Sequence, residues 1–275
     1  MPHWLAAYTL PALFALVLWW LSTGVLMWLA HRPLATVRAA LWGLGTLALL
    51  LLYVGADGRN DATLAGTYAA FGWATLAWGW LVLSYYGGVI TGVAPTRPAP
   101  RAVWPRFCAA LCANAHHDLL AAALLLLLVV VHRGAVNPLG LYTFVALWVM
   151  HTSARLLVFA GVPTFNDLLL PPRFRRQMAG LWQRRRFNAL FLPVIVASIA
   201  LDVLLVRWAA AAALPDAASL TMLACMVSLG IIEQALLMSP WELPLWNWTT
   251  ASAAPALPAP PAPPVPAAPR MYGTD

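Results

Sequence analysis

Seven long apolar runs constrain this chain more than any other feature of its sequence. They lie at roughly 5–29, 39–56, 64–90, 107–131, 139–160, 188–212 and 220–239. Each approaches the roughly 20 residues that a helix needs to cross the hydrocarbon core of a bilayer. Only 9% of the residues are charged, against about a quarter in soluble domains. The sequence therefore predicts an all-α polytopic membrane bundle of about seven transmembrane helices.

The arginines between these runs predict the orientation of the bundle. Eleven fall in the first, third and fifth loops, whereas three fall in the other loops. Because cytoplasmic loops carry an excess of basic residues, this bias places the odd-numbered loops in the cytoplasm. We therefore expect the N-terminus outside the cytoplasm and the C-terminus inside it. The eleven residues are Arg32, Arg38, Arg97, Arg101, Arg106, Arg173, Arg175, Arg176, Arg184, Arg185 and Arg186.

Every basic residue in the chain is arginine, and lysine is absent. A retinal Schiff base, pyridoxal-phosphate chemistry and a phosphate-binding P-loop each need a lysine, so the sequence excludes these three classes of protein. The net charge of +7 comes from loop arginines that orient a membrane protein. It therefore gives no reason to expect a nucleic-acid partner.

The chain divides into two predicted parts. Residues 1–248 form the seven-helix transmembrane domain, which ends in PWELPLWNW (240–248), a stretch whose tryptophan rings favour the headgroup region. Residues 249–275 are mostly alanine and proline. Proline lacks the N–H that a helical hydrogen-bond ladder requires. We expect 249–275 to be a disordered cytoplasmic tail.

Polar residues interrupt the fourth apolar run in the stretch LCANAHHDLL (111–120). His117 and Asp118 lie three and four residues after Asn114, so the three share one helical face. His116 points about a quarter-turn away. Ionisable groups at membrane depth are costly and normally face the bundle interior or a cavity. We therefore expect this face to point inward.

Three more ionisable residues lie at a similar depth in later runs: His151 and Arg155 in the fifth run and Glu233 in the seventh. One interpretation is a hydrogen-bonded network that fixes how the helices pack. A second is a ligand site in which His117 or His151 is the axial ligand of bacteriochlorophyll or another tetrapyrrole. A third is a catalytic metal site. The six histidines, however, lack the repeated HxxxH and HxxHH spacing of membrane di-iron enzymes.

Several stretches occur in the order and spacing of a known family. They are LWWLSTGVLMWL (18–29), YAAFGWATLAWGW (68–80), HHDLLA (116–121), NPLGLYTFVALWVM (137–150), SARLLVFAGVP (153–163) and RRRFNALFLP (184–193). Over about 15–248 the chain resembles the photosynthetic complex assembly protein 2 family of anoxygenic phototrophic bacteria. The resemblance implies a multi-pass assembly factor for reaction-centre or light-harvesting complexes in the bacterial inner (photosynthetic) membrane, with the N-terminus in the periplasm. Its implied partners are the bilayer and the subunits of those complexes, and its implied candidate ligand is bacteriochlorophyll.

The chain departs from that family's pattern at several positions. Leu81 and Val82 stand where relatives carry a His-Glu pair, Asp118 replaces a glutamate, His151 an arginine and Arg155 a lysine. These departures favour a scaffold or pigment-handling role over an enzyme. Two further functions stay open: a membrane enzyme of tetrapyrrole or carotenoid metabolism that uses the intramembrane His/Asp/Glu cluster, and an accessory subunit of the assembled photosynthetic complex.

Overall fold

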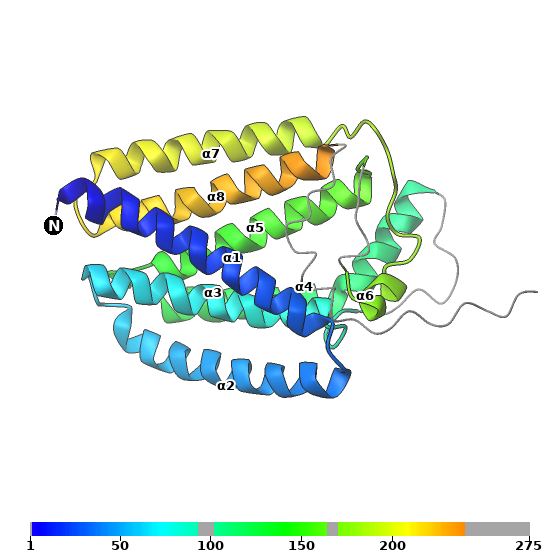
Figure 1. The fold of residues 1–275 in the computed structure, drawn as a ribbon, viewed down its shortest axis with the longest axis horizontal. Helices are drawn as coiled ribbons and strands as arrows, with labels where there is room; N and C mark the ends of the chain where they lie inside the picture. The colour runs from blue at the N-terminus through cyan, green and yellow to red at the C-terminus, as the bar shows by residue number, and fades with distance from the viewer. Residues whose placement is uncertain (1, 93–101, 164–169, 240–275) are drawn as a thin grey trace, which may run out of the picture.

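A computed structural model describes residues 2–92, 102–163 and 170–239, and these residues form a helical bundle (Figure 1). A π-helical turn, η1 (Leu5–Thr9), leads into the first helix. The helices are α1 (Leu10–Ala30), α2 (Leu34–Gly58), α3 (Leu64–Tyr86), α4 (Val103–Val131), α5 (Leu139–Ala160), α6 (Pro172–Gln177), α7 (Phe191–Ala211) and α8 (Asp216–Met238). The predicted runs 240–248 and 249–275, with Arg97 and Arg101, lie outside the described residues.

Five of the helical segments are long and apolar enough to cross a membrane. These are η1 with α1, then α4, α5, α7 and α8. A helix satisfies all its backbone hydrogen bonds internally, which is why apolar chain in a bilayer adopts this form. The helices α2 and α3 coincide with the two remaining predicted runs. The all-helical bundle is thus confirmed over the described residues, while the count of seven spans and the orientation stay predictions.

Loops from different parts of the chain meet at each end of the bundle. At one end, Arg173 donates to the carbonyl of Ala30 (3.3 Å), which joins the fifth loop to the first. At the other end, Arg59 donates to the carbonyl of Val131 (2.6 Å), which joins the second loop to the α4 terminus. The first and fifth loops, together with Gly92 at the start of the third, therefore share one end, called the arginine-rich end below. The predicted orientation requires this arrangement.

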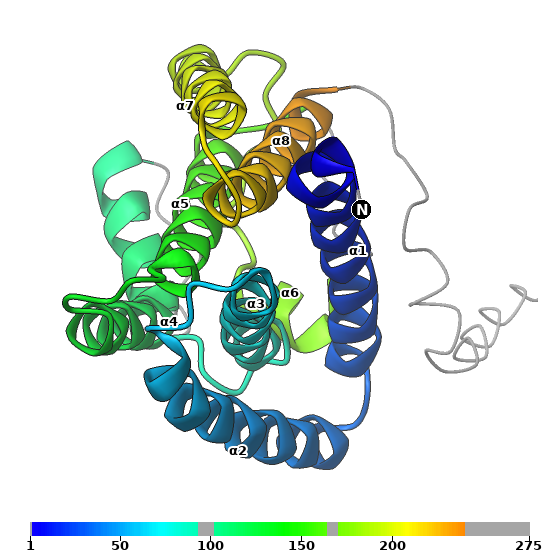
Figure 2. The same cartoon turned by 90° about the vertical axis from the view of Figure 1, so that its left-hand side faces the viewer.

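The helix α3 lies at the centre of the bundle, where it contacts α1, α2, α4, α5 and α8 (Figure 2). Its side chains are apolar on every face and most are buried, as expected for a helix surrounded by others. Thr63 caps its start by accepting a hydrogen bond from the Gly66 N–H (3.1 Å). Trp78 packs edge-to-face on Phe144 of α5, with ring centroids 5.5 Å apart. This packing joins the second half of α3 to α5.

The short helix α6 covers the arginine-rich end, where the sequence analysis expected only a loop. Pro172 stands in its first turn, a position that favours proline because no intrahelical N–H donor is needed there. Phe174 is buried and packs edge-to-face on Tyr85 and Tyr86, with centroids 4.7 and 5.0 Å away. The helix α6 is therefore anchored to the end of α3 by aromatic contacts.

Candidate functional site

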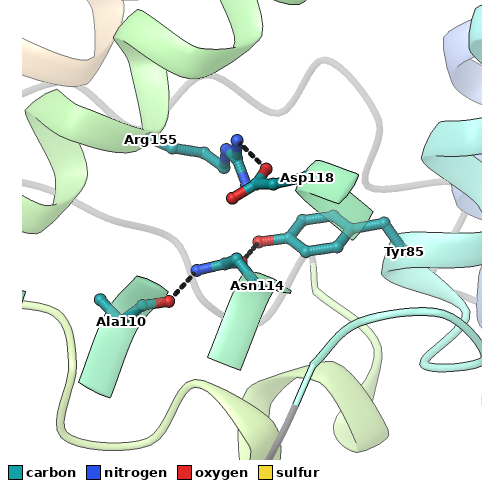
Figure 3. A network of polar contacts seen from close by, with 5 residues as sticks. All are labelled: Tyr85, Ala110, Asn114, Asp118 and Arg155. Atoms are coloured by element: carbon teal, nitrogen blue, oxygen red, sulfur yellow. Dashed lines mark hydrogen bonds and ion pairs between the residues drawn. The ribbon is translucent and has the colours of Figure 1, made fainter. Parts of the chain in front are cut away.

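An ion pair and two hydrogen bonds connect α3, α4 and α5 inside the bundle (Figure 3). Arg155 on α5 donates to an Asp118 carboxylate oxygen on α4 at 2.6 Å. The Tyr85 hydroxyl on α3 donates to the Asn114 side-chain oxygen on α4. The Asn114 side-chain nitrogen donates in turn to the Ala110 carbonyl (2.6 Å). Three helices are thus joined through side chains one helical turn apart on α4.

The two predicted histidines of the site lie next to each other. The ring centroids of His117 and His151 are 5.7 Å apart in an edge-to-face arrangement. His117 has no exposed surface, and the centroids of the Tyr85 and His117 rings are 4.2 Å apart. Neither ring nitrogen of His117 has a hydrogen-bond partner. His117 is therefore covered by Tyr85, whereas His151 lines a cavity.

A turn from the third loop contacts the backbone of α4 beside His117. The backbone N–H of His117 donates to the Thr91 carbonyl (2.9 Å), outside the helix. Gln177 of α6 donates to the carbonyls of Gly92 (3.1 Å) and Ala113 (3.3 Å). In an ordinary helix, the His117 N–H would donate to the carbonyl of Ala113, four residues earlier. Bonds from outside that reach such a pair can bend a helix, and α4 bends along its length (Figure 2).

Only glycine fits at position 92. A Cβ atom there would lie 2.3 Å from the Cys112 carbonyl oxygen and 2.6 Å from that of Ala113. The absent side chain lets the loop approach the α4 backbone closely enough for the bonds to His117 and Gln177. This contact positions the start of α4 relative to α6.

A cavity of about 140 Å³, called the α6 cavity below, lies between this network and α6. Its wall includes polar or ionisable side chains from α3, α4, α5 and α8, together with large apolar side chains from α6 and the loop after it. The polar group is Tyr85, Tyr86, Asn114, His151, Arg155 and Glu233; the apolar group includes Phe174, Met178, Leu181 and Trp182. One cavity thus combines hydrogen-bonding groups with an aromatic and aliphatic wall.

The structure gathers six of the seven predicted site residues. Asn114, His151, Arg155 and Glu233 line the α6 cavity, and Asp118 and His117 each contact a residue that lines it. The seventh, His116, is exposed and is not among the residues that line the cavity. Among the described residues, no three His, Cys, Asp or Glu side chains converge on a common metal position.

Several residues of this site were not predicted from the sequence: Tyr85, Tyr86, Phe174, Gln177 and Trp182. The adjacent tyrosines near the end of the third apolar run were a usable signal, because tyrosine hydroxyls inside a bundle need partners. Phe174 and Gln177 gave no such signal. They lie in the arginine-rich fifth loop predicted from the sequence.

Comparison with known proteins places this arrangement in a family. A family model described as "Protein of unknown function (DUF3623)" matches residues 5–256, which include the whole site. The chain belongs to the DUF3623 family. This DUF3623 chain is 31% identical over 252 residues to the "Uncharacterized 30.4 kDa protein in puhA 5'region" of Rhodobacter capsulatus, covering 88% of this chain and 91% of that protein. No solved structure matches the DUF3623 chain.

Proposed function

We propose that this protein is an inner-membrane assembly factor for photosynthetic reaction-centre or light-harvesting complexes. One observation carries the proposal: the Rhodobacter capsulatus relative is named for its place in the 5′ region of puhA, a reaction-centre gene. The apolar helical bundle is compatible with a protein that contacts other membrane subunits within the bilayer. The resemblance described from the sequence supports the same role.

Handling of bacteriochlorophyll belongs to the same proposal, but the α6 cavity does not fit a whole macrocycle as it stands. Pockets for drug-sized molecules measure about 300–1,000 Å³, and this cavity measures about 140 Å³. A flat ring could reach His117 only if Tyr85, whose ring lies 4.2 Å away, moved aside. Any pigment contact therefore involves the outer surface of the bundle or a rearranged α6.

A deletion strain tests the assembly role against the enzyme and subunit alternatives. We expect fewer assembled complexes, measured by membrane absorbance and by the levels of reaction-centre subunits, while pigment precursors stay at wild-type amounts. Re-expression of the intact chain should restore the complexes. If one tetrapyrrole or carotenoid intermediate accumulated and the purified protein converted it, the protein would be an enzyme of that metabolism and not an assembly factor. Stoichiometric recovery of the chain in finished complexes would replace it with the accessory subunit.

A further inference from the structure

The α6 cavity contains polar atoms that lack partners. Arg155 and His151 both line it, and the Arg155 Nε and His151 Nε2 atoms are buried without a hydrogen bond. The Arg155 Nε–H can only donate, so whatever satisfies it must bring an acceptor. Buried polar groups without partners are rare in folded proteins, and each calls for an explanation such as a bound molecule.

The charges around the cavity argue against an anionic ligand. Arg155 is the cation among the lining residues, and the Asp118 carboxylate already holds it at 2.6 Å. Glu233 adds a carboxyl group to the cavity wall. A fatty acid or a phosphate would therefore meet no unpaired positive charge. An uncharged acceptor, such as a carbonyl oxygen, avoids this repulsion.

The size and wall of the cavity favour one flat ring. An engineered apolar cavity of about 150 Å³ in another protein binds benzene, so about 140 Å³ accommodates a six-membered ring but no tetrapyrrole. The rings of Tyr86, Phe174 and Trp182 line this space. Aromatic side chains pack favourably against a flat ring.

The cavity is accessible beside α8. Glu233, which lines it, is exposed and stands five residues before the end of α8. At 1.5 Å per residue this is about 7.5 Å from the helix end, close to the boundary of the hydrocarbon region. An apolar chain attached to the ring can leave the cavity there and lie in the bilayer.

We propose that the α6 cavity binds the headgroup of a membrane quinone. A quinone ring is flat and uncharged, its opposed carbonyl oxygens accept hydrogen bonds from groups such as Arg155 and His151, and its apolar chain resides in the membrane. This proposal concerns binding only and stands independently of the assembly role.

The test uses the purified full chain in mild detergent and decylubiquinone as the probe. We expect saturable quenching of tryptophan fluorescence. Ala154 lines the cavity and is buried, so Ala154→Leu should fill it and raise the Kd at least about tenfold. His151→Phe keeps a ring but removes the nitrogens, and should also raise the Kd. Elution as a single peak checks that each variant folds.

A matched control fills a different space. Gly43 lines a separate apolar groove between α1, α2 and α3, where an added Cβ meets nothing within 4 Å. Gly43→Leu should leave the Kd within about twofold of wild type.

The proposal is overturned if quenching does not saturate, or if Ala154→Leu and His151→Phe bind as wild type does. Displacement of the probe by palmitate would indicate an anion site. Displacement of the probe by zinc protoporphyrin, with a Soret shift that His151→Phe abolishes, would indicate a tetrapyrrole site. Either of these two results would also overturn the proposal that the cavity binds a quinone.

Discussion

Arg155 on α5 and Asp118 on α4 form an ion pair at 2.6 Å that ties two membrane-embedded helices together beside the α6 cavity. Their side chains are 21% and 34% exposed, so the pair is only partly shielded. Either partner alone would leave an ionisable group without compensation at membrane depth, which is costly.

The two side chains should therefore contribute to stability as a coupled pair. We expect Asp118→Asn to lower the free energy of unfolding by about 1–3 kcal/mol, because the Arg155 guanidinium then loses the charge that compensates it. Arg155→Leu combined with Asp118→Asn should cost less than the sum of the single changes. Unfolding in detergent measures each variant. If the loss of stability in the double variant equalled the sum of the losses in the single variants, the two side chains would not be coupled.

The adjacent histidines of α4 should differ in their effect on function. His117 is fully buried without a hydrogen bond, and His116 is exposed. Because His117→Leu breaks no hydrogen bond of the side chain, the protein level should stay near wild type. We expect loss of assembled complexes with His117→Leu and normal assembly with His116→Leu, both expressed in a deletion strain. Full assembly in both strains would reduce His117 to a packing residue.

The contact between the third loop and α4 should depend on glycine. An added methyl at Gly92 would lie 2.3 Å from the Cys112 carbonyl oxygen, so Gly92→Ala must push the loop away. We expect a loss of roughly 1–3 kcal/mol of stability, typical of overpacking. Gly72→Ala is the matched control, because nothing lies within 4 Å of its added Cβ. Equal unfolding curves for the two variants would contradict the close approach.

Reporter fusions test the orientation of the bundle. A reporter joined after Arg186 should behave as cytoplasmic, and one joined after Arg59 as periplasmic, because the arginine-rich loops share one end of the bundle. Alkaline phosphatase and green fluorescent protein at both positions give opposite signals and so check each other. The reverse pattern at either position would change the helix count or invert the bundle.

The loop between α2 and α3 should give the protein a dependence on acidic pH. Hydrogen bonds from the Thr63 side chain and backbone lower the pKa of Asp61. A carboxyl whose pKa is lower in the folded state stabilises the fold above its unfolded pKa, and this stabilisation is lost as the pH falls through the folded pKa. Thermal unfolding at pH 6 and pH 3 should therefore show a smaller drop for Asp61→Asn than for wild type. An equal drop would assign the acid sensitivity to other carboxyl groups.

The sequence alone determined the long helices, but not the short helix α6. The fifth predicted run, 139–160, coincides with α5 (Leu139–Ala160), and the others differ from their helices by a few residues at the ends. Long apolar runs identify helices because unpaired backbone groups are costly in hydrocarbon, so each segment must pair its own N–H and C=O groups. Helical spacing also predicted that Asn114 and Asp118 share a face, since this relationship depends on local geometry alone.

Only the tertiary structure decided what that face meets. Tyr85 covers His117, the turn at Gly92 contacts the α4 backbone, and Gln177 reaches the same turn from α6. These contacts join segments far apart in the chain, and they depend on loop paths that hydrophobic periodicity does not encode. The same packing leaves His151, rather than His117, on the wall of the α6 cavity. The reason is that α3 places the Tyr85 ring over His117.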